Sequence, residues 1–176
     1  MDTSRRLPAR NELIAILTAI AIPIHVWALF RVLASIPQWL LRATPWELVG
    51  IISYTLMLTL IETLLVFLFV VGLIALVSRQ RLGNLLIPMV AVFGVLATGL
   101  MVVFLLIPLN GLLLYAGLAF AGFLALLIAS YLILRRSSKL AALITTLVDR
   151  LVPLAVLYLF FDVIAVVIVV VRNLFA

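Results

Sequence analysis

Three ionisable side chains, those of His25, Glu62 and Asp162, lie near the middle of three separate apolar stretches of the sequence. Imidazole and carboxyl groups can pass protons, hold ions or hydrogen-bond between helices, and within an apolar span each is unfavourable unless it is paired. Because the three fall at similar depths in their spans, we expect the helices that carry them to face one another. Each shares a predicted helix face with a polar residue: Thr18, Thr59 and Tyr158, respectively.

The sequence leaves three roles open for this intramembrane polar cluster. It could be a buried hydrogen-bond network that fixes helix packing. It could be a relay for protons or ions, or the lining of a polar cavity for a substrate. Finally, His25 could bind a haem or a chlorin as a single axial ligand, alone or in a site shared with a partner chain. The chain has one histidine and cannot supply two axial imidazoles by itself.

Arg31 is the remaining charged residue near this cluster. It follows His25 by about 9 Å along a helix. Its guanidinium would extend to the membrane surface, or it would pair with Glu62 or with Glu47. The sequence does not choose between these arrangements.

The elements that position these residues follow from composition. Of 176 residues, 68% are hydrophobic and 10% are charged, and the mean hydropathy is +1.47. A soluble domain is usually about a quarter charged, so the bilayer must be the solvent for most of this chain. We predict a single all-α polytopic membrane domain over residues 1–176. Its spans cover about 12–36, 45–78, 85–107, 112–134 and 153–172, with short interfacial helices near 36–43 and 139–151.

Local signals mark several helix ends. Thr44, Pro45 and Glu47 have the spacing of a capping box with proline at the first helical position, which predicts that the second span begins at Pro45. Gly83 is expected to adopt a left-handed conformation after the break at 79–81, and residues 108–111 have the composition of a tight turn. Pro153 would either begin a new helix or kink a longer one.

Basic residues alternate between the predicted connections. The N-terminal segment and the second and fourth connections hold most of them, whereas the first connection and the C-terminus hold few and the third holds none. Cytoplasmic loops carry an excess of lysine and arginine. The pattern therefore predicts a cytoplasmic N-terminus and a C-terminus on the opposite side.

The fourth span carries a ridge of small residues at intervals of four. Small residues at this spacing allow close approach of another helix. The ridge would either pack on the third span, where Gly94 and Thr98 have the same spacing, or dock against another subunit. Its members are Gly117, Ala121, Ala125 and Ala129.

Several functional classes are excluded by what the sequence lacks. It contains no cysteine, no phosphate-binding glycine-rich loop and no zinc-protease or serine-hydrolase motif, so we predict no metal site and no catalytic residue. Its basic residues form no single patch, which argues against nucleic acid. We expect membrane lipids and other membrane subunits, or a second copy, as partners.

Three functions compete on this basis. The first expectation is a non-catalytic integral membrane subunit or scaffold that packs against other membrane proteins. The alternative is a small transporter or channel component that uses His25, Glu62 and Asp162. Less favoured is an intramembrane enzyme acting on lipid, with Glu62 and Asp162 as acid and base.

Overall fold

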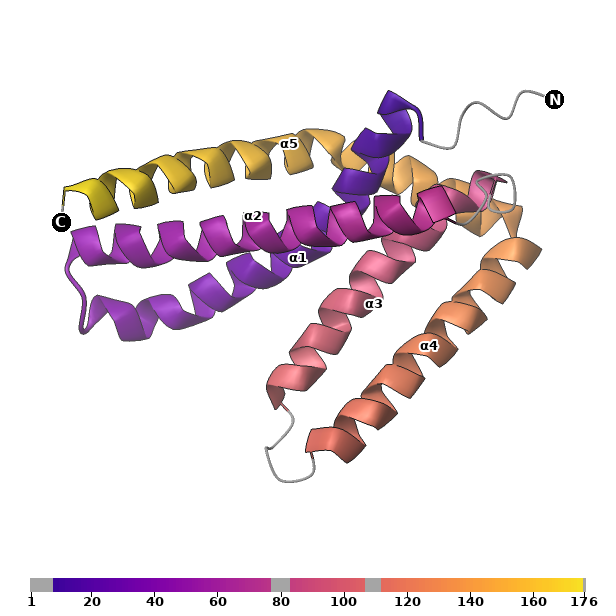
Figure 1. The fold of residues 1–176 in the computed structure, drawn as a ribbon, viewed down its shortest axis with the longest axis horizontal. Helices are drawn as coiled ribbons and strands as arrows, with labels where there is room; N and C mark the ends of the chain where they lie inside the picture. The colour runs from indigo at the N-terminus through magenta and orange to yellow at the C-terminus, as the bar shows by residue number, and fades with distance from the viewer. Residues whose placement is uncertain (1–7, 77–82, 107–111, 176) are drawn as a thin grey trace.

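The computed structural model describes residues 8–76, 83–106 and 112–175. Within these ranges the regular structure is helical throughout, and five helices are long and apolar enough to span a membrane. A single 3-10 turn, η2 (Gly83–Leu85), precedes the third of them. The helices, drawn in Figure 1, are α1 (Arg10–Leu40), α2 (Pro45–Leu76), α3 (Leu86–Leu106), α4 (Leu112–Arg136) and α5 (Ser138–Leu174).

Each predicted span coincides with one helix, but neither predicted interfacial helix exists as a separate element. The segment predicted at 36–43 is the end of α1, which continues through Pro37 to Leu40. The segment predicted at 139–151 is the first part of α5, a continuous helix of 37 residues that contains Pro153. Pro153 has no N–H to donate to the carbonyl of Asp149, and its ring displaces that carbonyl, but both residues are exposed, so the disturbance stays at the surface of the helix. The helix therefore passes through Pro153 without ending.

Two local signals are confirmed by the structure. The Thr44 amide donates to Oε2 of Glu47 at 2.7 Å, and the Glu47 amide donates to the Thr44 hydroxyl at 3.3 Å, so the capping box forms and α2 begins at Pro45. Gly83 has a positive φ of 45°. The predicted break at 79–81 and the predicted turn at 108–111 lie outside the described residues.

The helices form two groups, which Figure 1 separates clearly. Helices α1, α2 and α5 pack against one another along the long axis of the molecule, whereas α3 and α4 form a hairpin that diverges from them. Helix α3 attaches this hairpin to α1, and α4 packs mainly on α3. The grouping confirms the expected meeting of the first, second and fifth spans.

A close approach of backbones joins α3 to α1. A Cβ atom added to Gly94 would lie 2.7 Å from the carbonyl oxygen of Ala19 and 3.3 Å from Cγ of Pro23. Pro23 has no N–H, so the Ala19 carbonyl lacks its usual helical donor. Gly94 therefore packs directly over the Ala19 carbonyl, the group on α1 that Pro23 leaves without a helical donor.

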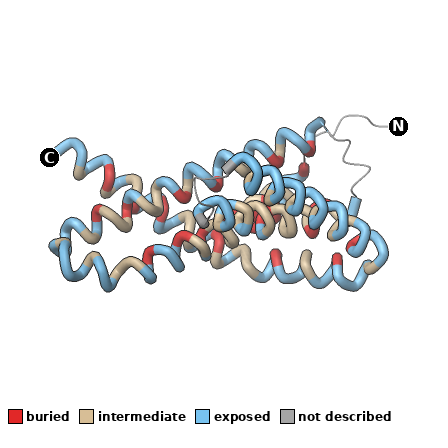
Figure 2. Tube along the Cα trace, turned by 90° about the horizontal axis from the view of Figure 1, so that it is seen from below, coloured by how far each residue is buried: buried red, intermediate tan, exposed pale blue. Residues whose placement is uncertain are grey.

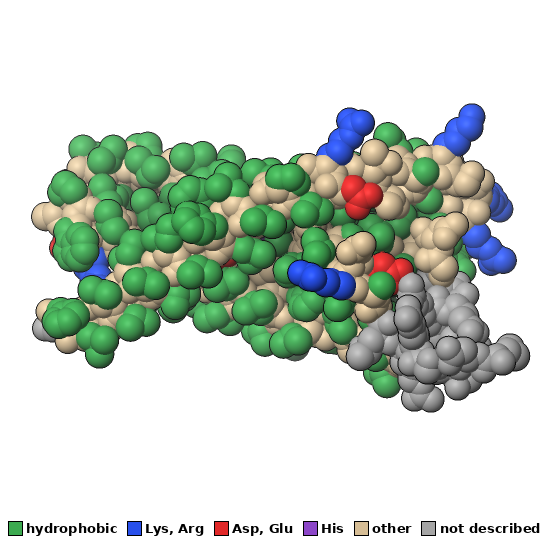
Figure 3. Space-filling model, turned by 90° about the horizontal axis from the view of Figure 1, so that it is seen from above, with side chains coloured by type: hydrophobic (Ala, Val, Ile, Leu, Met, Phe, Trp, Pro, Cys, Tyr) green, Lys and Arg blue, Asp and Glu red, His purple; other side chains and the backbone are tan. Residues whose placement is uncertain are grey.

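Buried residues are few and lie where the helices cross, as Figure 2 shows. The largest apolar cluster joins α1 to α2, α3 and α5 and includes Ile16, Ile20, Val70, Val90 and Val148. Helix α4 is the extreme case, because only 6% of its most apolar stretch is buried. Most large apolar side chains point outward, and Figure 3 shows that they cover most of the visible surface.

Candidate functional site

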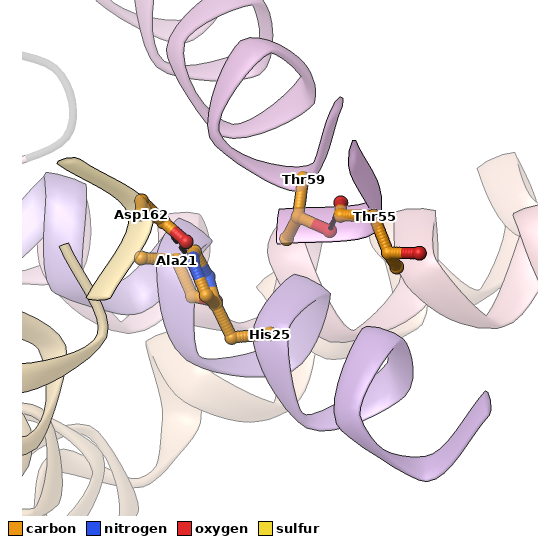
Figure 4. Close-up of polar contacts among 5 residues, drawn as sticks. All are labelled: Ala21, His25, Thr55, Thr59 and Asp162. Carbon is orange, nitrogen blue, oxygen red and sulfur yellow. Dashed lines mark hydrogen bonds and ion pairs between the residues drawn. The ribbon is translucent and has the colours of Figure 1, made fainter. Parts of the chain in front are cut away.

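The polar centre of the bundle is a histidine–aspartate pair between α1 and α5. Nε2 of His25 lies 2.7 Å from Oδ2 of Asp162, and Nδ1 of His25 lies 2.8 Å from the carbonyl oxygen of Ala21, one turn earlier on α1. Figure 4 shows the imidazole between these two partners. His25 is 3% exposed and Asp162 is 0% exposed, so the pair is closed to the surroundings.

The hydrogen bonds fix how many protons the pair holds. A carbonyl oxygen can only accept, so Nδ1 of His25 carries a proton and donates it to Ala21. The contact between Nε2 and Asp162 then needs a further proton, carried either by the carboxyl group or by an imidazolium. Both arrangements leave the pair with no net charge. This is the favourable state for two titratable groups removed from water.

Tyr158 packs against this pair from a position one helical turn before Asp162 on α5. Its ring stacks on the imidazole, with centroids 5.2 Å apart and planes inclined by 4°. The second carboxyl oxygen of Asp162, Oδ1, is buried and has no hydrogen-bond partner among the described residues. The aromatic face covers the imidazole on one side and thus helps to keep the pair dry.

The threonines of the cluster lie on the interior faces of their helices. Thr18 is 2% exposed on α1, and Thr59 is 4% exposed on α2. The Thr59 hydroxyl donates to the carbonyl of Thr55 at 2.8 Å, within its own helix, as Figure 4 shows. Thr63 is fully buried, and its hydroxyl has no partner among the described residues. None of these hydroxyl groups hydrogen-bonds to His25 or Asp162.

Glu62 does not join the pair either. It is exposed on the surface of α2, and among the described residues it has no hydrogen-bond or ion-pair partner. Arg31 is likewise exposed on α1 and pairs with neither Glu62 nor Glu47, whose carboxylate caps its own helix. The structure therefore brings together His25, Asp162 and Tyr158, and it leaves both remaining charged residues at the surface.

The small-residue ridge of α4 also faces outward. Gly94, its predicted partner on α3, packs on α1 instead, and the contact between α3 and α4 runs through Phe93 and Phe123, whose rings meet edge to face at 5.9 Å. Every member of the ridge is exposed: Gly117, Ala121, Ala125 and Ala129. Of the two arrangements left open for the ridge, packing on the third span is not formed within this chain, and docking against another subunit stays a prediction.

The geometry also bears on cofactor binding. Both nitrogens of His25 are engaged in hydrogen bonds. To bind the iron of a haem or the magnesium of a chlorin, the imidazole would have to give up its hydrogen bond to Asp162 or to the Ala21 carbonyl. Among the described residues, no group of three or more histidine, aspartate or glutamate side chains is arranged to hold a metal ion.

Sequence reasoning missed a second polar contact region between α2 and α5. Nη1 of Arg172 donates to the carbonyl of Trp46 at 3.1 Å, and the Tyr54 hydroxyl donates to Oδ1 of Asn173 at 2.9 Å. The Arg172 side chain lies over Gly50, where a larger residue would collide with it. The sequence shows Gly50 early in the second span and Arg172 at the end of the fifth, but no pattern in it links the two residues.

The fold and the site define an all-helical bundle with five helices of membrane-spanning length and a dry acid–imidazole pair at its centre. Comparison of the chain with protein-family models, with curated proteins and with solved structures finds no match.

Proposed function

We propose that this chain is a non-catalytic integral membrane subunit that packs, through the outer face of α4, against a transmembrane helix of another protein or of a second copy. The observation that carries the proposal is the exposure of the whole ridge on α4, the least buried helix of the bundle. Small side chains allow two helix backbones to approach closely, and such contacts drive association in lipid, where apolar surface alone gives no driving force.

Glu62 supports the same role from a second helix. A carboxylate at the middle of a membrane-spanning helix is unfavourable by roughly 2.5–3.5 kcal/mol on insertion scales. Glu62 is exposed among large apolar neighbours such as Leu58 and Leu65. A donor on a partner helix would satisfy this carboxyl group and offset that cost.

The orientation we propose places the N-terminus in the cytoplasm and the C-terminus outside. Figure 1 places the starts of α1, α3 and α5 and the ends of α2 and α4 toward one end of the molecule. That end carries Arg10, Arg135, Arg136 and Lys139 among the described residues, whereas the opposite half carries Arg31, Arg42 and Arg172. Cytoplasmic ends of membrane proteins are enriched in such residues.

The buried pair fits a structural role in this subunit. It ties α1 to α5 with both ring nitrogens satisfied, as interhelical polar contacts commonly do in membranes. A transport role would use the same pair, but it is less well supported because Glu62 and Arg31 lie outside it. A lipid-acting enzyme with Glu62 and Asp162 as paired carboxylates has no support in this geometry, because the two groups make no hydrogen bond.

The test compares bulky substitutions at two glycines that face open space. A Cβ atom added to Gly117 on the ridge or to Gly99 on α3 would meet nothing within 4 Å. The measurement is the mass of the protein extracted with its native lipids into nanodiscs. We expect an assembly larger than the 19.4 kDa chain, reduced to a single chain by Gly117→Leu with Ala121→Leu and unchanged by Gly99→Leu. A wild-type protein that is a single chain with no partner would contradict the proposal.

A further inference from the structure

A cavity of about 840 Å³ lies between the first turns of α3 and α5 and the end of α4. Its rim is polar and exposed and includes Arg135, Lys139 and Asn84. Its floor is apolar and buried, with Leu86 and Leu134 each 4% exposed. A polar rim above an apolar floor suits an amphipathic ligand better than a free ion.

Two unpaired cations give this cavity its charge. Arg135 and Lys139 have no ion-pair partner among the described residues. The acidic residue on the rim, Glu12, is engaged in capping α1, because its Oε2 accepts the Ala9 amide at 2.9 Å. Because Glu12 supplies one negative charge against the two cations, the charged residues of the lining sum to +1 and would attract an anion.

Backbone groups at the start of α5 add to the attraction. Ser138 and Lys139 line the cavity and occupy the first helical positions after the N-cap, Ser137, where N–H groups have no partner within the helix. The Ser137 hydroxyl accepts the Leu140 amide at 3.4 Å and so leaves those two N–H groups for another acceptor. A helix N-terminus beside two basic side chains is well suited to bind a phosphate group.

We propose that this cavity binds the phosphate headgroup of an anionic phospholipid, with the glycerol and upper acyl chain over the apolar floor. The position of the cavity favours lipid as the source of the phosphate. It lies where the apolar stretch of α4 ends at Arg135 and Arg136, which is the depth of lipid headgroups. Leu132 and Ile133, exposed at the end of α4 beside the lining residue Leu134 and beyond the ridge, provide apolar contact for the acyl chains.

The experiment measures binding of dioleoyl phosphatidylglycerol to the delipidated full chain in detergent, by native mass spectrometry. Each basic residue near an anionic headgroup contributes about fivefold in affinity, so Arg135→Gln with Lys139→Gln should weaken binding about 25-fold. The matched control, Arg136→Gln with Arg150→Gln, removes the same charge from exposed residues outside the cavity and should change binding by less than about threefold.

A second variant tests the cavity without changing its charge. Ala142 is exposed on the cavity lining, and Ala142→Trp should fill the space and abolish retention of the lipid. Equal weakening by the two charge variants would contradict the proposal, as would undiminished binding to Ala142→Trp. Equal retention of dioleoyl phosphatidylcholine would show that the headgroup charge is irrelevant. Binding of inorganic phosphate as tight as that of the lipid would show that the ligand is the free anion.

Discussion

The imidazole of His25 on α1 and the carboxyl group of Asp162 on α5 share a hydrogen bond of 2.7 Å in a fully buried position. The accepting carbonyl of Ala21 fixes the proton on the other ring nitrogen, so the pair is neutral overall. The hydrogen bond holds α1 and α5, which are far apart in sequence, in one fixed alignment along their lengths.

The first prediction concerns the energy of this contact. His25→Leu or Asp162→Leu alone leaves a buried polar group without its partner and should lower the free energy of unfolding by about 1–3 kcal/mol. Replacing both by leucine should restore stability to within about 1 kcal/mol of the wild type, because no unpaired group remains. Reversible unfolding in mixed micelles measures the free energy of unfolding of each variant. Strictly additive losses in the double variant would mean that the two residues do not interact.

The second prediction separates the two parts of Tyr158. The ring stacks on the imidazole, whereas its hydroxyl makes no hydrogen bond to the described residues. Tyr158→Phe should therefore change the free energy of unfolding by less than about 0.5 kcal/mol, and Tyr158→Ala should lower it by about 1–3 kcal/mol. The same unfolding assay applies. A larger loss for phenylalanine than for alanine would assign the role to the hydroxyl.

The third prediction compares two glycines of α3. Gly94→Ala places a Cβ atom 2.7 Å from the Ala19 carbonyl oxygen, and because that atom is backbone, relief requires α1 and α3 to separate. We expect a loss of about 1–3 kcal/mol in the free energy of unfolding. Gly99→Ala meets nothing within 4 Å and should be neutral, or stabilising by up to about 1 kcal/mol. Equal effects at both positions would contradict the close packing of α3 on α1.

These contacts also show which parts of the structure were predictable. Apolar run lengths located all five helices, and the spacing of Thr44, Pro45 and Glu47 located the start of α2. Orientation about each helix axis was harder to predict. In a soluble helix the polar face marks the exterior, but here both faces are apolar, so polarity marks neither. The sequence therefore leaves the ridge of α4 with two possible partners, Gly94 on the third span or another subunit, whereas in the structure Gly94 packs on α1 and the ridge residues are exposed.

The candidate site, too, was predictable only in part. His25 and Asp162 meet because an unpaired polar group is unfavourable in an apolar interior and each finds the other. The same rule placed Glu62 with them, although it lies outside on α2. A carboxyl group satisfied by another chain obeys the rule equally well, and one sequence cannot distinguish the two solutions.

The fourth prediction follows from the exposure of Glu62. Glu62→Leu removes no contact within the chain and should change the free energy of unfolding of the isolated protein by less than about 0.5 kcal/mol. In native membranes it should reduce the yield of the assembled complex, because the partner loses its acceptor. Leu68→Ala, at an exposed position on the same helix, is the control. Loss of stability in the isolated chain would instead indicate an internal role for Glu62.

The most direct test of the proposed subunit role is thiol accessibility along α4, because the chain has no native cysteine. Single cysteines are placed on the ridge at Ala121 and Ala125, and on another exposed face at Leu126. Each variant is treated with a membrane-permeant maleimide in native membranes and again after the single chain has been isolated in a detergent that dissociates the assembly. We predict that the two ridge cysteines react several-fold more slowly in the membrane than in the isolated chain, while the control cysteine shows no such difference. Equal changes in reactivity at all three positions would contradict this prediction.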